Sequence, residues 1–229
     1  MIPGYDWTEV AVELDGFGCA ILPGLLDAEA CAAMAARYDG IGFRSHIHMA
    51  RHGFGRGEYK YFAYPLPDPV AEMRAALYPP LQAIANRWNR RMGIDQVFPA
   101  EHADFVAQCH AAGQKRPTPL LLDYGPGDYN CLHQDLYGEH VFPLQVAVLL
   151  SQPGEDFSGG EFVLTEQRPR MQSRAEVVPL TRGDAVVFAV HHRPVKGSRG
   201  DYRVFMRHGV SRVRSGHRRT LGIIFHDAA

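Results

Sequence analysis

Two histidines and one aspartate carry the clearest chemical signal in this sequence. His133 and Asp135 are two positions apart. In a β-strand such residues point to the same face, so both can bind one metal ion. His208 lies far along the chain and is the best candidate for a third ligand from a distant strand. Two imidazoles and one carboxylate form the facial triad typical of non-haem iron(II). The sequence therefore predicts a catalytic iron site at these three residues.

Downstream of His208, a second group of residues can anchor an organic acid. The triad leaves three coordination positions open, which suit a bidentate keto acid and dioxygen. The far carboxylate of a keto acid needs a cation inside the fold, and Arg218 can supply a bidentate fork. Thr220 lies two residues further, on the same predicted strand face, and can add a hydroxyl donor. Arg219 competes for this role, but strand alternation lets only one of the two arginines face inward, and the Gly216-x-Arg218-x-Thr220 spacing favours Arg218.

Other histidines compete with His208 for the role of distal ligand: His140, His191, His192, His217 and His226. His191 and His192 are expected in a polar turn, where adjacent residues cannot both face inward. His217 is expected to point outward, and His226 to lie on the surface near the C-terminus. His140 follows the predicted strand and is expected in a loop.

The ordered set of motifs resembles the 2-oxoglutarate/Fe(II) dioxygenase superfamily, on its prolyl-hydroxylase-like side. The match spans roughly residues 117–225 and combines a metal triad, a carboxylate anchor and a supporting frame. Its parts are His133-x-Asp135, the distal His208, Gly216-x-Arg218-x-Thr220, Tyr124-x-x-Gly127, Gly159-Gly160-Glu161 and Arg182-Gly183-Asp184.

The resemblance implies a double-stranded β-helix, or jelly roll, with iron at its open mouth. 2-Oxoglutarate would chelate the iron, and its other carboxylate would meet Arg218, helped by Thr220 and the hydroxyl of Tyr124. Oxidative decarboxylation to succinate and CO2 would accompany the use of O2 to oxidise a substrate C–H bond. The resemblance also admits ascorbate as an accessory cofactor.

The chain resembles still more closely a bacterial family of oxygenases labelled as acting in oxidative demethylation of damaged nucleic acid. The segments 49–62 and 164–171 are similar to its signatures. The substrate stays open between damaged nucleic acid, a protein side chain and a small molecule. The alternative function is a cupin-like metal-binding or sensory barrel without oxygenase turnover. Cupins typically show H-x-H where this chain has His133-Gln134-Asp135, and they have no need of Arg218.

The segment Arg51–Tyr61 is rich in glycine, basic and aromatic residues. It is interpreted either as a lid or substrate-recognition loop, or as an ordered surface loop. Arg56, Lys60 and Tyr61 are its candidate substrate contacts. Cys131 shares strand parity with His133, so it is expected close to the metal or as a small apolar filler.

The pattern of apolar runs and turn residues along the chain predicts a mostly β fold with N-terminal helices (α+β). From residue 117 onward, short runs rich in Val, Leu and Phe alternate with Gly, Pro and Asp turns, which favours an antiparallel sandwich or barrel. Residues 1–116 are expected to be largely helical and to pack on a core of residues 117–229 as one structural unit. Asp27 is expected to cap a helix, and Pro79 and Pro80 are expected to split the helical stretch Val70–Met92 into two helices.

Charge and cysteines bound the class of protein. The net charge of the 229-residue chain is -1, but residues 160–229 carry 13 Lys+Arg against 6 Asp+Glu. That basic C-terminal part could face a polyanion, or its arginines could be solvated strand-surface residues. The four cysteines form no C-x-x-C pair and are expected to be reduced. No apolar run approaches the roughly 18 residues that span a bilayer, and the N-terminus lacks a signal-peptide pattern. A cytoplasmic location without a membrane partner is therefore expected.

Overall fold

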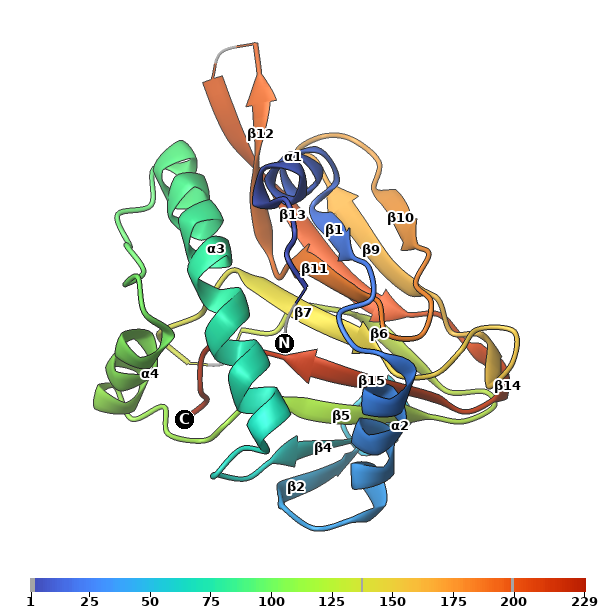
Figure 1. The fold of residues 1–229 in the computed structure, drawn as a ribbon. Coiled ribbons are helices and arrows are strands. Elements are labelled where there is room, and N and C mark those ends of the chain that lie inside the picture. The colour runs from blue at the N-terminus through green and yellow to red at the C-terminus, as the bar shows by residue number, and fades with distance from the viewer. Residues whose placement is uncertain (1–2, 137, 199) are drawn as a thin grey trace.

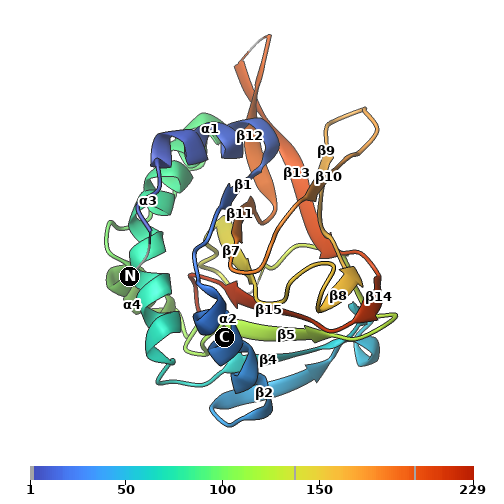
Figure 2. The same ribbon diagram turned by 45° about the vertical axis from the view of Figure 1, so that its right-hand side comes forward.

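The body of the fold consists of two antiparallel sheets, seen from two directions in Figures 1 and 2. This computed structural model describes residues 3–136, 138–198 and 200–229. The larger sheet has the order β1-β11-β7-β15-β5-β4-β2, formed by Cys19–Leu22, Ala185–Ala189, Leu144–Leu149, Arg218–Ile223, Leu120–Tyr124, Glu58–Phe62 and Phe43–His48. The smaller sheet has the order β10-β9-β13-β6-β3, with β12 paired to β13, formed by Arg174–Val178, Phe162–Gln167, Gly200–Val210, Tyr129–His133, Gly55–Arg56 and His192–Gly197. β8 (Phe157–Gly159) pairs with β14 (Val213–Gly216) in a separate two-stranded antiparallel sheet. The mostly β class with a jelly-roll core is thus confirmed.

The described α-helices all come before β5 in the sequence, and they lie outside the sheets. They are α1 (Trp7–Phe17), α2 (Ala28–Ala36), α3 (Asp68–Met92) and α4 (His102–Ala111), with 3₁₀ turns at Arg37–Asp39 and Met49–Arg51. Figure 2 shows α1, α3 and α4 gathered on one side. The predicted cap is confirmed, because the Asp27 carboxylate accepts a hydrogen bond from the Ala30 amide at 2.8 Å. Within the described residues, no helix is both long and apolar enough to cross a membrane. The four cysteines are free, as expected: Cys19, Cys31, Cys109 and Cys131.

The prediction that Pro79 and Pro80 divide the long helix is wrong, because α3 continues unbroken through both residues. Neither proline can donate an intrahelical hydrogen bond, and an interior proline costs about 3 kcal/mol. The neighbouring side chains of Leu77, Tyr78 and Leu81 are fully buried in the core. Burying one such large apolar side chain stabilises the fold by roughly 1.5–3 kcal/mol. Packing of this helix face therefore offsets the two missing bonds.

The first 116 residues contribute strands as well as helices. β1 pairs with β11, β2 and β4 extend the larger sheet beyond β5, and β3 pairs with β6. These strands are short, and β2 and β4 are rich in charged and polar residues. The apolar run Cys19–Leu22 indicates a strand, and β1 confirms it. The conformation of β2, β3 and β4 depends on pairing with strands that come much later in the chain, so the local sequence pattern did not reveal them. The boundary between residues 116 and 117 stays a prediction.

Two expectations about histidines are wrong. His192 begins β12, opposite Phe205 of β13, because the ladder between these strands continues to that point. His226 is fully buried, because the C-terminal segment returns to pair with Arg116 through Ala228. Its Nδ1 accepts a hydrogen bond from the Phe142 amide at 3.2 Å, and burial lowers the pKa of His226 to about 4.

A buried ion pair fastens the C-terminal segment to the helices. Arg74 of α3 donates to Asp227 at 2.7 Å, and the Tyr64 hydroxyl donates to the same carboxylate at 2.7 Å. His110 of α4 also contacts this carboxylate at 2.7 Å. Burial by itself would raise the pKa of Asp227, but Arg74 and the hydrogen bonds outweigh it and lower the pKa below its ordinary value. The carboxylate therefore contributes more stability than a solvated one.

We expect Asp227→Asn to lower the free energy of unfolding at neutral pH by about 3–5 kcal/mol, since it leaves Arg74 buried without a counter-charge. A carboxyl group with a depressed pKa contributes stability above its unfolded-state pKa of about 3.9 and loses it as pH falls through the folded-state value. The difference between variant and wild type should therefore shrink below about pH 4. Urea unfolding across pH tests this, with the exposed Asp95→Asn as control. A loss no larger than that of the control would contradict it.

Candidate active site

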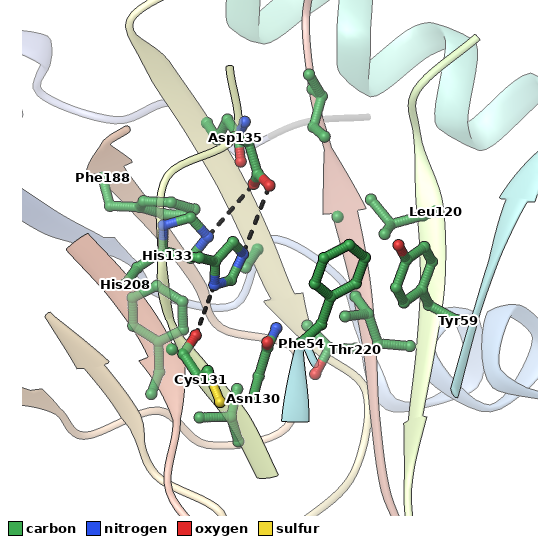
Figure 3. Close-up of a pocket in the computed structure, with 18 of the residues that line it drawn as sticks. Phe54, Tyr59, Leu120, Asn130, Cys131, His133, Asp135, Phe188, His208 and Thr220 are labelled. Atoms are coloured by element: carbon green, nitrogen blue, oxygen red, sulfur yellow. Dashed lines mark hydrogen bonds and ion pairs between the residues drawn. The ribbon is translucent and has the colours of Figure 1, made fainter. Parts of the chain in front are cut away.

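A cavity of about 370 Å³ lies between the two sheets. Its wall combines side chains from β4, β5, β7 and β15 of the larger sheet with side chains from β6, β9 and β13 of the smaller one. Most of these side chains are apolar, and a few polar groups converge among them, as Figure 3 shows. This composition is typical of a site that binds a small organic molecule.

His133, Asp135 and His208 converge at one end of this cavity (Figure 3). His133 is the last residue of β6 and lies directly opposite His208 of β13 in the antiparallel ladder. The Asp135 carboxylate reaches to 3.5 Å from His133 Nε2 and 3.4 Å from His208 Nε2. The possible metal-binding atoms of the three side chains all lie within 4.8 Å of one another. β6 ends at His133, so Asp135 approaches from the following loop, and the expectation that both residues share one strand is wrong.

Hydrogen bonding engages Nδ1 of His133 and leaves Nε2, the nitrogen that faces Asp135, available to bind a cation. Its Nδ1 donates to the Cys131 carbonyl at 2.7 Å, because a carbonyl oxygen can only accept. In the neutral ring, Nε2 then presents a lone pair towards the Asp135 carboxylate, and two acceptors face each other. A cation placed between them removes this repulsion. The donor set therefore fits a metal ion.

The charge states of Asp135 and His208 suit a divalent metal, and His133 would release a proton on binding one. Burial alone would raise the pKa of Asp135, but its bonds to His133 and His208 hold the pKa well below its ordinary range. Burial lowers the pKa of His133, yet its contacts with Asp135 outweigh this and raise the pKa overall. Burial lowers the pKa of His208, which favours the neutral imidazole that a metal requires. The Phe188 ring packs against His208 with centroids 4.5 Å apart and restrains its orientation.

Arg218 lies further inside the cavity, on β15. The register of β15 and β5 places it directly opposite Tyr124. Its guanidinium is 2% exposed and donates from Nη1 to the Thr220 hydroxyl at 2.6 Å. No acidic side chain of the described structure forms a salt bridge with it, and burial lowers the pKa of Arg218 to about 10. A buried cation without a carboxylate partner is costly, so this position calls for an anion.

Two further polar groups share the cavity with Arg218. The Tyr124 hydroxyl is fully buried, and burial raises the pKa of Tyr124, so the group stays protonated and can donate. Gln145 of β7 is 3% exposed, and its Nε2 finds no hydrogen-bond partner among the described residues. Sequence reasoning missed Gln145. The available signal was a single amide side chain in the otherwise apolar run 142–150.

The competing residues lie elsewhere. Arg219 points out of the cavity and contacts Asp123 at 3.1 Å, as strand alternation predicts. His217 is exposed, also as expected, and within the described structure the other rival histidines do not line the cavity either. Cys131 does line it, but its side chain is exposed and it serves His133 through its carbonyl oxygen, so it is no buried apolar filler.

The segment Arg51–Tyr61 is ordered by strand pairing and contributes aromatic side chains to the cavity. Phe54, Tyr59 and Tyr61 line it, whereas Arg56 and Lys60 do not. The Arg56 side chain is 61% exposed, and Lys60 Nζ donates to the Tyr38 carbonyl at 2.8 Å.

Gly57 lets this segment approach the cavity wall. It has a positive φ, and a Cβ at this position would lie 2.8 Å from Tyr124 Cδ1. Only glycine satisfies both the backbone conformation and the close contact. The segment therefore packs directly against Tyr124, which lies opposite Arg218.

Comparison with known proteins gives a family and a fold. Residues 57–228 match a family described as oxygenases catalysing oxidative methylation of damaged DNA. Two sequences from strains of Mycobacterium tuberculosis, both described as uncharacterized, are 51% identical over 168 residues, which is 73% of this chain and 72% of each relative.

Solved structures with the same fold are more distant in sequence. A Pseudomonas putida prolyl-4-hydroxylase is similar with a TM-score of 0.57 and 15% identity, over 98% of this chain and 100% of that chain. An oxidoreductase of the 2OG-Fe(II) oxygenase family from Burkholderia pseudomallei is similar with a TM-score of 0.56 and 16% identity, over 100% of this chain and 95% of that chain. Because the family match covers well over half of its length, the chain belongs to this family of oxygenases, and its fold is that of the prolyl-hydroxylase-like 2-oxoglutarate/Fe(II) oxygenases.

Proposed function

We propose that this oxygenase depends on Fe(II) and 2-oxoglutarate, and that it hydroxylates or oxidatively demethylates its substrate while releasing succinate and CO2. The observation that carries the proposal is the pairing, in one cavity, of a His-Asp-His cluster with a buried arginine that has no carboxylate partner among the described residues. A cupin-like metal-binding or sensory barrel explains the cluster but gives no role to Arg218. The oxygenase reading explains both.

In this proposal His133, Asp135 and His208 are the iron ligands. The iron, when bound, supplies the activation of O2 coupled to decarboxylation of the keto acid. The Cys131 carbonyl holds the His133 ring in the tautomer that offers Nε2. Phe188 restrains the His208 ring from its face. O2 is the oxidant, and we include ascorbate as an accessory reductant.

Three side chains are proposed to hold the far carboxylate of 2-oxoglutarate. Arg218 supplies the charge and a planar fork, and Thr220 fixes the orientation of its guanidinium through the 2.6 Å hydrogen bond. The Tyr124 hydroxyl, directly opposite Arg218 in the strand register, is a buried donor in the same cavity. A carboxylate there would neutralise the buried cation and satisfy these groups together.

We expect anaerobic addition of Fe(II) and 2-oxoglutarate to produce a weak visible charge-transfer band. His133→Ala and Asp135→Ala should abolish it, because each removes a proposed iron ligand, and so should His208→Ala. Absorption spectra of each variant, with succinate production in air, provide the measurement. His217→Ala, which replaces an exposed rival histidine, is the matched control. Wild-type protein that shows neither the band nor succinate would refute the proposal.

Arg218→Ala should raise the 2-oxoglutarate concentration for half-maximal succinate production by roughly 10- to 100-fold, as expected for a lost charge-assisted hydrogen bond worth about 1.5–3 kcal/mol. The iron affinity should change far less. Arg219→Ala, its outward-facing neighbour, serves as the control. Parallel titrations of 2-oxoglutarate and Fe(II) separate the two effects, and an equal loss of both affinities would indicate misfolding.

We propose damaged nucleic acid as the substrate. The family description supports this choice, and Phe54, Tyr59 and Tyr61 offer aromatic faces on which a base can stack. Hydroxylating an N-methyl group makes it leave as formaldehyde, so the chemistry available to an oxygenase is removal of the methyl group. The four free cysteines favour a reducing compartment, and we propose that the protein acts in the cytoplasm.

A single-stranded oligonucleotide carrying an N-methylated base tests the substrate. Wild-type protein should release formaldehyde, and Phe54→Ala should raise the oligonucleotide concentration required by about 5- to 100-fold, because stacking contributes about 1–3 kcal/mol per base. Val97→Ala replaces an exposed apolar side chain outside the cavity and is the control. Absence of formaldehyde, together with binding that does not weaken as salt is raised, would exclude nucleic acid while leaving the oxygenase reaction standing.

A further inference from the structure

A second group of metal-binding side chains lies apart from the cavity. His46 and His48 of β2 and Glu58 of β4 place their possible ligand atoms within 4.8 Å of one another. His46 Nε2 lies 2.6 Å from one carboxylate oxygen of Glu58, and His48 Nδ1 lies 2.9 Å from the other. The two imidazole rings are 4.5 Å apart between centroids. Two histidines and one carboxylate are a common ligand set for zinc.

Strand geometry builds this cluster. His46 and His48 are two residues apart on β2, so their side chains share one face of the sheet. The antiparallel register sets His48 opposite Glu58, which brings the carboxylate between the two rings. β2 is the edge strand of the larger sheet, and all three side chains are about 40% exposed. A metal ion can therefore reach the cluster from solvent without passing through the cavity.

The local charges favour a cation. Glu58 supplies an acidic group to the cluster, with its two carboxylate oxygens facing the two imidazole rings. Lys60 is a competing cation, opposite His46 in the ladder. Its ammonium is held elsewhere, by the Tyr38 carbonyl at 2.8 Å and over the Tyr38 ring at 4.4 Å.

We propose that His46, His48 and Glu58 form a second metal site, which binds Zn²⁺ with solvent completing a tetrahedral shell. Small rotations of these exposed side chains suffice to bring the ligand atoms to the roughly 2.0–2.2 Å that zinc requires. The site differs from the His133, Asp135 and His208 cluster in being superficial and in lying on the outer side of the sheet. It does not rest on the oxygenase reaction.

The position of this site suggests what the metal does. His48 and Glu58 are the residues at which the chain leaves β2 and enters β4, so they close the base of the segment 49–57. That segment carries Phe54 into the cavity. Tyr59 follows Glu58 on β4, and it lines the cavity from the face of that strand opposite to Glu58. Zinc bound at this base would lock the segment in place, as a clip across the ends of a loop does.

The metal content of the full-length protein tests the proposal. In the His133→Ala/His208→Ala background, which removes the first cluster, the protein should bind one equivalent of Zn²⁺ in native mass spectrometry. Adding Glu58→Gln should remove that equivalent. Adding instead His52→Ala, an exposed histidine of the same segment outside the ligand group, should retain it. Circular dichroism establishes that each variant is folded.

Proteolysis provides a readout of the clip itself. Arg51 and Arg56 are exposed trypsin sites within the segment. Zn²⁺ at ten times its dissociation constant should slow cleavage there by about tenfold, because binding reduces the population of the open segment by that factor. The Glu58→Gln variant should show no such protection. Zinc that fails to bind in the double-variant background, or an equivalent that survives Glu58→Gln, overturns the proposal.

Discussion

The pairing of β13 with β6 is the interaction on which the rest of the site depends. It sets His208 directly opposite His133, although the two residues are far apart in sequence. At Gly209 the strands approach so closely that a Cβ would lie 2.7 Å from the Asn130 carbonyl. A slip of one residue would turn His208 away from the cavity and leave a single imidazole beside Asp135. The cluster is therefore a property of the strand register more than of any one loop.

Two buried charges of opposite sign occupy the cavity at different places. Asp135 is negative and lies between two imidazoles, and Arg218 is positive and is bonded to a neutral hydroxyl. Each is costly to bury without a full counter-charge. β15 holds Arg218 in the cavity and the loop after β6 holds Asp135 there, so that cost becomes a binding preference. One end of the cavity selects a cation and the other selects a carboxylate, which matches a metal ion chelated by a dicarboxylic keto acid.

Sequence reasoning succeeded where a regular strand carried the residues and failed where the chain left the strand. Arg218 faces inward and Arg219 outward because β15 is regular. Asp135 was expected near His133 because alternate residues of a strand share a face. It does lie near His133, but β6 has already ended, and the loop after the strand brings the carboxylate there. Likewise, Pro79 and Pro80 are strong local breakers, but the burial of their neighbours keeps α3 continuous.

The sequence by itself determined the chemistry, because residue type and short spacing identify a His-Asp-His set followed by an arginine and a threonine. It also determined the β-rich class of the fold through its alternating runs. Only the tertiary structure decided which distant groups meet. It placed Tyr124 opposite Arg218 and His46 beside Glu58, because strand partners and their register arise from packing between segments far apart in the chain. Local pattern carries no record of those pairings.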